Sequence, residues 1–301
     1  MNILQFQNTD YQEVARIRND TFAGMKLSQF IWQPCQQVES LQEDCSKYIC
    51  SDGGVRGYGA AYRLDDTHFR LNLIVDPAHT NQGIGTLLLR NIEVATKKMG
   101  GKYLQARLLE NMESSLRFAQ SRAFVKIHTM RGMSLCKEDF SYKRWVELGK
   151  KLSARGFLTA TLKEELEANN NPVEKLAQLH RYSQQGWPSP DPTQEHNSPL
   201  ESLKARFANI AFPDLFTIMK LNEEYVGYTS AKDHYTATAV HPDYRGMGIA
   251  TYMKAYDLKR CFEEGGRYFE SASANPTMQR VNEKLGYKFN GLCEARFVKP
   301  L

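Results

Sequence analysis

The sequence predicts an α/β protein built from two tandem copies of one domain, and three observations lead to this prediction. The chain has 301 residues, a length typical of about two domains. The segment VDPAHTNQGIGT, which begins at Val75, recurs as VHPDYRGMGIAT from Val240, at an offset of 165 residues. Each copy follows a run of β-forming residues and precedes a run with helical periodicity, so a strand–loop–helix unit occurs twice.

The composition is that of an ordinary globular protein, with 42% hydrophobic and 24% charged residues. No apolar run is long enough to span a bilayer, and the first residues show no secretory signal pattern, so no membrane partner is expected. The six cysteines form no CxxC pair, which favours reduced thiols in a cytoplasmic protein over disulfides or a metal site. The net charge of +5 is mild and no Lys/Arg run occurs, so no nucleic-acid partner is expected.

A second cluster of matches at the same offset supports a duplication. Gly100-Gly101-Lys102-Tyr103 aligns with Gly265-Gly266-Arg267-Tyr268. Both copies therefore contain a turn marked by proline, a glycine-containing loop, a helix of equal length, a Gly-Gly stop and a strand that begins beside a basic residue and Tyr. Two clusters of matches in one register indicate duplication rather than coincidence between unrelated units.

The strands and helices of each copy are expected in the same order. Residues 68–75 and 235–240 are rich in β-formers and end shortly before a proline, which cannot continue a central strand. Residues 84–99 and 249–264 have apolar positions three and four apart, as in a helix, and the Gly-Gly pairs end them. A strand, a second helix and a final strand follow, at 103–110, 113–122 and from Phe124 in the first copy, and at 268–274, 276–286 and from Tyr287 in the second.

The composition places a domain boundary near the middle of the chain. Residues 138–155 are charged and are expected to form a helical linker between an N-terminal domain, 1–137, and a C-terminal domain, 156–301. A new strand is expected to begin at Phe157. Residues 187–199, WPSPDPTQEHNSP, are long and irregular in composition, so they are expected to form a functional or a mobile loop.

The glycine-containing loop in each copy precedes a helix, and this arrangement suits an anion. The first N–H groups of a helix lack intrahelical partners, and the helix dipole is positive at that end. Glycine lets the backbone approach a ligand closely. The loops therefore predict a pyrophosphate site, although they match neither the dinucleotide fingerprint GxGxxG nor the P-loop pattern.

Two motifs of the C-terminal copy together resemble those of the GCN5-related N-acetyltransferases, the GNAT superfamily. Residues 244–250, YRGMGIA, are similar to the acetyl-CoA-binding loop of that family, which reads Arg or Gln, two residues, Gly, one residue, then Gly or Ala. Residues 275–287, NPTMQRVNEKLGY, resemble its later helix with a Leu-Gly-aromatic ending. The resemblance implies two tandem GNAT-like domains, each a mixed, mostly antiparallel sheet flanked by helices, as in two-domain members of the family.

The resemblance also implies acetyl-CoA as a co-substrate, held by the C-terminal copy. Backbone N–H groups after the loop are expected to bind the pyrophosphate, and the strand end at Val240 and His241 to bind the pantetheine arm and the thioester carbonyl. Asn275 is expected either to contact the cofactor or to cap the helix that begins at Pro276. The complete set of expected cofactor-binding residues is Val240, His241, Arg245, Gly246, Met247, Gly248, Ile249, Ala250 and Asn275.

The N-terminal copy departs from the family pattern. Thr80 stands where Arg or Gln belongs, although Gly83 and Gly85 remain. Met112 occupies the place of the family's Asn, and the later helix ends at Arg122-Ala123-Phe124 without a Gly. Two roles for this copy are open, namely weak binding of CoA or a purely structural role.

The acid–base groups are less clearly marked than the cofactor loop. Many members of the family place a Tyr general acid in the later helix, but here Asn282 holds that position, and it does not readily protonate a thiolate. Ala119 holds the same position in the first copy. Glu270 is the candidate catalytic base, with Asp191 and Glu195 of the Pro-rich loop as alternatives, and a solvated surface carboxylate is the simpler interpretation of each.

Three further residues have a functional and a structural interpretation. His241 is either a proton relay or a structural histidine, and Trp187 either lines an acceptor pocket or packs in the core. Tyr287 is expected to be the core aromatic residue of the final strand rather than a displaced general acid.

The function predicted from these residues is direct acyl transfer from acetyl-CoA to the amine of a small molecule, with the C-terminal copy as the catalytic one. The alternative is a non-catalytic CoA-binding or scaffold protein, which the missing Tyr favours and the intact C-terminal loop opposes. The acceptor and the oligomeric state are not predicted, because acceptor pockets arise from variable elements of a fold.

Overall fold

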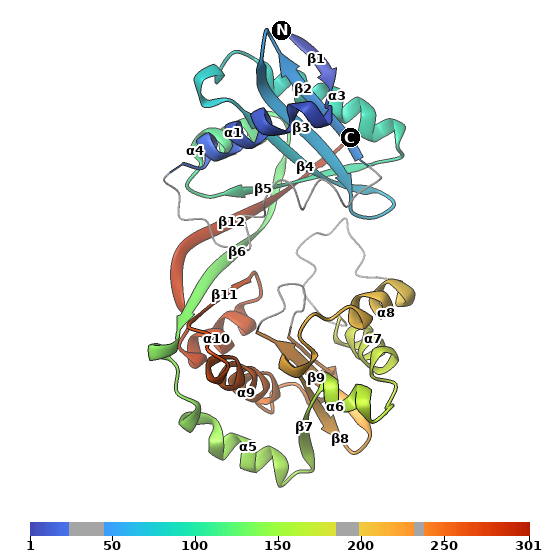
Figure 1. The fold of residues 1–301 in the computed structure, drawn as a ribbon, viewed down its shortest axis with the longest axis vertical. Coiled ribbons are helices and arrows are strands. Elements are labelled where there is room, and N and C mark those ends of the chain that lie inside the picture. Colours follow the sequence, from blue (N-terminus) through green and yellow to red (C-terminus); the bar gives the residue numbers. More distant parts are fainter. Residues whose placement is uncertain (24–44, 185–198, 232–237) are drawn as a thin grey trace. The chain divides into compact units, whose positions relative to one another are not determined.

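The computed structural model describes residues 1–23, 45–184, 199–231 and 238–301 (Figure 1). The chain divides into two compact units, the first formed by residues 1–130 together with 292–301, and the second by residues 131–291. Trp187, Asp191 and Glu195 lie outside the described residues, so the roles expected for them stay predictions.

The first unit contains most of the N-terminal half together with the end of β12 (Lys288–Pro300), and its elements between residue 68 and residue 130 follow the order that the sequence predicts. Its elements are β1 (Asn2–Gln5), α1 (Tyr11–Thr21), β2 (Cys45–Ser51), β3 (Val55–Arg63), β4 (His68–Val75), α3 (Ile84–Lys98), β5 (Tyr103–Leu109), α4 (Glu113–Ser121) and the start of β6 (Val125–Cys136).

The second unit is richer in helices. Its elements are the end of β6, α5 (Val146–Ser153), β7 (Phe157–Thr161), α6 (Leu162–Glu167), α7 (Pro172–Ser183), α8 (Leu200–Ala208), β8 (Phe216–Leu221), β9 (Glu224–Ser230), β10 (Ala239–Val240), α9 (Ile249–Glu263), β11 (Tyr268–Ser273), α10 (Pro276–Leu285) and the start of β12 (Lys288–Pro300).

The strand pairing agrees with a mixed, mostly antiparallel architecture. One sheet has the order β1-β2-β3-β4-β5-β12-β6-β11, and the other has the order β10-β9-β8-β7. In the first unit, β4 and β5 are parallel and pair only over residues 68–70 and 103–105. Beyond Arg70 and Gln105 the two strands no longer pair, so they diverge toward the end of β4 that leads into the loop.

Strand β3 shows how the sequence fixes the layers of the first unit. Its side chains alternate between two faces, as in any strand. Tyr58 and Tyr62 pack against α1 and share a hydrogen bond of 3.0 Å between their hydroxyl groups. Gly59 faces α3, where a Cβ atom would lie 2.6 Å from Ile92, so only glycine lets the helix approach this closely. The sheet is therefore covered by α1 on one face and by α3 on the other.

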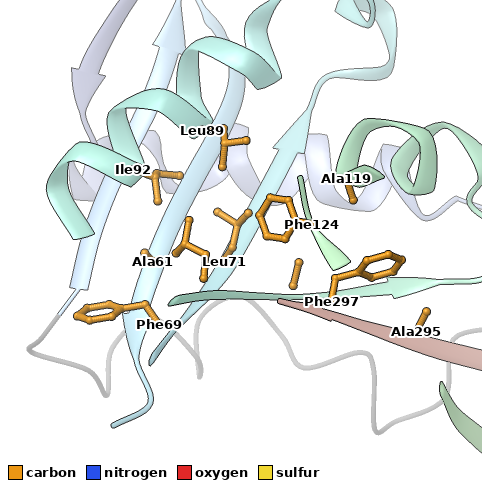
Figure 2. Packing of buried hydrophobic residues seen from close by; sticks show 11 residues of the cluster. Ala61, Phe69, Leu71, Leu89, Ile92, Ala119, Phe124, Ala295 and Phe297 are labelled. Atoms are coloured by element: carbon orange, nitrogen blue, oxygen red, sulfur yellow. The ribbon is translucent and has the colours of Figure 1, made fainter. Parts of the chain in front are cut away.

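The core under α3 is the largest apolar cluster of the first unit (Figure 2). Leu89 and Ile92 of α3 point toward the strands that carry Ala61 and Leu71 (Figure 2). Phe297 of β12 belongs to the same cluster. The last strand of the chain therefore helps to close the core of the first unit.

The second unit repeats this layering around β8 and β9. Met253 of α9 packs against Met219 of β8 on one face of the sheet. Leu176 of α7 and Phe207 of α8 pack with Tyr228 of β9 on the other face. Two helix layers therefore enclose the sheet, as the resemblance implies.

The two loop-following helices end as the sequence predicts. The N–H of Gly101 donates to the carbonyl of Thr96 at the end of α3, and the N–H of Gly266 donates to that of Cys261 at the end of α9, both at 2.9 Å. Gly100 and Gly265 have φ values of +84° and +94°. These are the hydrogen bonds and the left-handed residue of a Schellman motif, so the prediction that Gly-Gly ends each helix is confirmed.

The bounds of the compact units differ from those of two consecutive domains joined by a linker. The sequence analysis assigns 1–137 and 156–301 to separate domains, whereas residues 292–301 belong to the first unit. The physical reason is that Glu294–Pro300 pair with β5 in an antiparallel ladder. Residues 138–155, expected as a helical linker, contain two short 3-10 turns and α5, and they lie within the second unit.

Candidate functional site

The loop between β10 and α9 has a backbone shaped by its glycines. After a 3-10 turn at Pro242–Tyr244, Arg245 is extended with φ −68° and ψ 157°. Gly246 then has φ +80°, and Gly248, which caps α9, has φ +86°. Positive φ is the region that glycine adopts without strain, so glycine suits the path of the chain at both positions.

The corresponding loop of the first unit follows the same path with different residues. Thr80 has φ −64° and ψ 158°, close to the values of Arg245. Asn81 has φ +61° where the second unit has Gly246, and Gly83 has φ +82°. Asparagine tolerates this region better than most residues. The first copy has therefore lost the side-chain motif but kept the backbone conformation.

The start of α9 presents unpaired backbone donors. The N–H of Tyr252 donates to the carbonyl of Gly248 at 2.9 Å, which is the first intrahelical bond. The preceding helical N–H groups, those of Ile249, Ala250 and Thr251, therefore lack an intrahelical acceptor. Gly248 supplies no side-chain cap. These donors and the positive end of the helix dipole suit an anion such as a pyrophosphate.

One residue of β10 directs its backbone N–H and C=O groups away from the neighbouring strand, β9. The N–H of His241 donates to the carbonyl of Val226 at 2.9 Å, so His241 is bonded toward β9. Alternate residues of an antiparallel strand face opposite sides, so Val240 directs its N–H and C=O away from β9. Among the described strands, β10 is the edge of its sheet. Of the two expected pantetheine contacts, Val240 is therefore the one whose N–H points outward.

The first unit repeats this arrangement at Val75. There the N–H of Asp76 donates to the carbonyl of Arg56 on β3 at 2.9 Å, so Val75 directs its N–H toward the side of β5. Because β4 and β5 stop pairing at Arg70 and Gln105, this N–H faces the gap where the strands have diverged. Both units thus combine an outward strand-end amide with a loop of the same backbone conformation before a helix.

Comparison with models of known protein families identifies the family in which both loops occur. The model of the acetyltransferase (GNAT) family matches residues 11–124 and again residues 176–287. The two matched segments contain both loops and cover more than half of the chain. The chain belongs to the acetyltransferase (GNAT) family. The resemblance found in the sequence and the predicted fold class are confirmed.

Solved structures show the same tandem architecture. A GCN5-related N-acetyltransferase from Sphaerobacter thermophilus is 14% identical with a TM-score of 0.70, and the match covers 99% of this chain and 95% of that one. A tandem GNAT protein from the clavulanic acid biosynthesis pathway is 18% identical with a TM-score of 0.65, covering 99% and 98%. A glucosamine N-acetyltransferase region of a fungal multi-domain β-N-acetylglucosaminidase is 12% identical with a TM-score of 0.78, covering 99% of this chain and 38% of that longer one.

These likenesses show a shared fold rather than a shared acceptor, because the sequences have diverged so far. A search of curated proteins finds no match. The GNAT family generally uses acetyl-CoA, and the backbone of the loops described above suits the pyrophosphate of such a ligand, because left-handed residues precede unpaired amide donors at a helix start.

In this GNAT protein, the Arg245 side chain holds the loop in place. Its Nε donates to the carbonyl of Val240 at 3.3 Å, and its Nη2 donates to the carbonyl of Ser183 at 2.6 Å. Ser183 is the last residue of α7, so the guanidinium lies at the negative end of that helix. The residue expected to contact the cofactor is therefore engaged with two backbone carbonyls.

The residue directly after β10 in the second unit differs in type from the residue directly after β4 in the first unit. His241 accepts from the N–H of Asp243 through Nδ1 at 3.4 Å, and its ring lies beside those of Tyr182 and Tyr244. Asp76 holds the equivalent place in the first unit and pairs with Arg16 of α1 at 2.9 Å. The hydrogen bond from Arg16 lowers the pKa of Asp76. Both side chains cap the following 3-10 turn.

Helix α5 contacts the loop of the second unit, which sequence reasoning missed. A Cβ atom on Gly248 would lie 3.1 Å from Leu148, and one on Gly149 would lie 2.5 Å from the ring of Tyr252. Gly149 therefore lets α5 approach the first turn of α9. An isolated glycine inside a predicted helix was the available signal, since such a glycine often marks a close contact.

Glu270, the candidate base, lies on β11 opposite Ser134 of β6. Phe269 packs in the core with α9, so Glu270 lies on the other face of the strand. The hydroxyl of Tyr268 donates to its carboxylate at 3.1 Å. In the described residues β11 pairs with β6 and not with β10, and the role of Glu270 as the catalytic base stays a prediction.

Three of the residues singled out in the sequence lie in α10 or directly beside it, and the structure shows the surroundings of each. Asn275 caps α10, because its Oδ1 accepts from the N–H of Thr277 at 2.9 Å. Asn282 is fully buried, with Nδ2 donating to the Ser271 hydroxyl at 3.0 Å, so it faces β11 rather than solvent. Tyr287 is 5% exposed in the core beneath α9, which confirms its expected packing role.

Two further features of the described residues concern metal binding and membrane spans. No group of three His, Cys, Asp or Glu side chains within 1–23, 45–184, 199–231 and 238–301 is placed to hold a metal ion. None of the helices in those ranges has the length and apolar character needed to cross a bilayer.

Proposed function

We propose that this GNAT protein transfers an acetyl group directly from acetyl-CoA to the amine of a small molecule, and that its second unit is the catalytic one. The observation that carries the proposal is the loop from Arg245 to Gly248, with left-handed glycines and unpaired amide donors at the start of α9. The family match supports acetyl transfer in general terms.

The residues of the second unit would divide the work as follows. Acetyl-CoA, when bound, supplies an activated thioester. The amides of Gly246 to Ala250 would hold its pyrophosphate, and the outward N–H of Val240 would bind its acyl-carrying arm. A fixed donor of this kind stabilises negative charge that develops on the thioester oxygen, an effect worth about 3–4 kcal/mol in well-studied cases.

The proposed reaction balances without a covalent enzyme intermediate. The amine nitrogen forms a bond to the acyl carbon while the carbon–sulfur bond breaks, and the proton that the nitrogen loses ends on the CoA sulfur. Glu270 is the proposed base that first accepts this proton. Holding both substrates side by side supplies much of the rate enhancement.

The alternative function is a CoA-binding protein without catalysis. It is supported by Asn282, because a fully buried amide at the place of the family's general acid cannot deliver a proton to the sulfur. The matched loop conformation of the first unit supports a second anion site, with Thr80 in place of Arg245. A protein with two such sites and no acid–base group would bind CoA without turnover.

One assay separates the two functions. The purified full chain is incubated with acetyl-CoA and a panel of amines that includes amino acids, polyamines, amino sugars and peptide N-termini, and release of the CoA thiol is followed. Transfer predicts thiol release that depends on one class of amine, with the acetylated amine found by mass spectrometry. Binding of acetyl-CoA without release for any amine in the panel would favour the binding protein.

A further inference from the structure

Three arginines occupy one face of the sheet in the first unit. They are Arg70 of β4, Arg107 of β5 and Arg296 of β12. Their strand neighbours Leu71, Ala106 and Phe297 pack beneath α3, so the arginines lie on the opposite face, away from α3. The three strands are adjacent in the sheet, which places the three guanidinium groups in one cluster.

The pairing register brings like charges together. Arg107 and Arg296 are directly opposite each other across the β5–β12 ladder. Side chains in such a pair have Cβ atoms about 5 Å apart, and like charges there destabilise a sheet. Arg70 pairs with Gln105, two residues before Arg107, at the point where β4 and β5 cease to pair. The cluster therefore lies where the two strands begin to diverge.

One carboxylate is set against the three cations. Oε1 of Glu294 lies 3.2 Å from Nε of Arg296 and 3.8 Å from Nε of Arg107, so one oxygen serves both. Arg70 makes no hydrogen bond or ion pair with any residue that the structure describes. Counted over the described residues, the three arginines and Glu294 carry an excess of two positive charges on a partly enclosed surface.

The surroundings of Arg70 and Arg107 disfavour the charged form of both side chains. Burial, followed by repulsion from Arg296, lowers the pKa of Arg70. Burial, followed by repulsion from Arg70 and Arg296, also lowers the pKa of Arg107. A bound anion would remove this repulsion, and a guanidinium can bind a carboxylate or a phosphate through two parallel hydrogen bonds.

The second unit lacks this feature. At the repeat offset, Arg107 corresponds to Ala272 of β11, and the residue paired with Ala272 is Gly132 of β6. The position that holds two opposed arginines in the first unit therefore holds two small neutral residues in the second. Since the described part of the second unit folds without them, the two opposed arginines are not a requirement of the fold.

We infer that this face of the first unit binds an oxyanion, the phosphate or carboxylate group of a small molecule, through Arg70, Arg107 and Arg296. The inference stands independently of acetyl transfer, because it rests on the register and charges of β4, β5 and β12. It gives the first unit a ligand of its own in a chain whose other half carries the complete acetyl-CoA loop motif.

Thermal unfolding of the full chain tests this site with inorganic phosphate and malonate as probes, each compared with chloride at equal ionic strength. We expect at least one probe to raise Tm in the wild type. Arg70→Gln should weaken that probe roughly 10- to 100-fold, the effect of losing a hydrogen bond to a charged group. Arg117→Gln removes an equal charge from an exposed position of the same unit, 71% exposed, and should leave the response unchanged.

The chloride data distinguish a ligand role from a structural one. Since Arg70 has no partner in the described residues, Arg70→Gln should not lower Tm in chloride, and relief of repulsion should raise it slightly. Arg107→Gln provides a second variant with the same expected loss of the anion response. A response to phosphate alone identifies a phosphate site, and a response to malonate alone identifies a carboxylate site. The inference is overturned if neither probe stabilises the wild type, or if both variants keep the full response.

Discussion

The Nη2 atom of Arg245 donates a 2.6 Å hydrogen bond to the carbonyl oxygen of Ser183, the last residue of α7. Through Nε the same side chain reaches the carbonyl of Val240, so one guanidinium joins the loop, the strand before it and the end of a helix. The motif arginine of this GNAT protein therefore has a positioning role that the pattern of the family loop does not reveal.

Replacing Arg245 should destabilise the second unit. Arg245→Ala removes charge-assisted bonds to two carbonyls, each worth about 1.5–3 kcal/mol, so we expect the free energy of unfolding to fall by about 3 kcal/mol or more. Urea unfolding of the full chain measures this. Thr80→Ala, at the equivalent place in the first unit, removes only an exposed 3.3 Å bond and is the matched control.

Unchanged stability with weaker cofactor binding would show that Arg245 contacts the cofactor instead of holding the loop. If Arg245→Ala unfolds like the wild type but binds acetyl-CoA much more weakly, the hydrogen bonds to Ser183 and Val240 contribute nothing to stability, and the side chain acts on the cofactor.

Asn282 should not be a catalytic residue. Its side chain is fully buried and donates to Ser271, so it faces the strand rather than a ligand. We expect Asn282→Ala to lower kcat by less than about tenfold, whereas loss of a general acid typically costs about 100- to 10,000-fold. Steady-state kinetics with the best amine of the panel provide the measurement. A thousandfold loss with unchanged acetyl-CoA affinity would show that Asn282 acts in the chemical step.

Glu270→Gln tests the proposed base. If the carboxylate accepts the amine proton, kcat/KM should fall by about 100-fold or more in the variant. The decrease in kcat/KM at low pH that protonation of this base causes in the wild type should also disappear. Tyr268→Phe removes the hydroxyl that donates to Glu270 at 3.1 Å without removing the carboxylate, and it should change the rate far less. An unchanged rate and profile in Glu270→Gln would exclude Glu270 and direct the search to Asp191 and Glu195.

His180 should make the second unit less stable in acid. Burial lowers the pKa of His180 from 6.5 to about 4. Between these values the unfolded chain binds a proton that the folded chain excludes, so stability falls as the pH falls through this window. The loss should reach about 3 kcal/mol near pH 4, since one pKa unit corresponds to about 1.4 kcal/mol.

A matched variant isolates this contribution from other titrating groups. His180→Gln keeps a polar group beside the hydroxyl of Tyr228, the partner of His180 Nδ1, but cannot be protonated. The difference in unfolding free energy between wild type and variant should change with pH between about 7 and 4. A constant difference would mean that His180 does not titrate in this range.

The sequence predicted the repeated elements because each carries its own local signal. The strand predicted at 68–75 is β4, His68–Val75, and the helices predicted at 84–99 and 249–264 are α3 and α9 to within one residue. Proline, helical periodicity and Gly-Gly act over a few residues, so a single sequence reveals them. The positive φ values of Gly246 and Gly248 follow from the same local chemistry.

The remaining features depend on contacts between distant segments. Nothing near residue 294 indicates that Glu294–Pro300 pair with β5 of the first unit. The bond from Arg245 to Ser183 joins residues 62 positions apart, and the opposition of Arg107 and Arg296 exists only once the strand register is known. The N-terminal loop departs from the family motif, and the structure shows that its backbone conformation is nevertheless kept, because Asn81 adopts φ +61°.

The most direct test of the central claim compares the two loops in the full chain. Gly246→Val and Asn81→Val each force a β-branched residue into positive φ, at a cost of about 1–3 kcal/mol, and a Cβ on Gly246 would meet no neighbouring atom. Acetyl-CoA affinity is measured by calorimetry and thiol release by steady-state kinetics. If the second unit is catalytic, Gly246→Val should weaken acetyl-CoA binding at that site by about tenfold or more and lower turnover in parallel, while Asn81→Val keeps its turnover. Loss of turnover in Asn81→Val, with full activity in Gly246→Val, would contradict the account and place the reaction in the first unit.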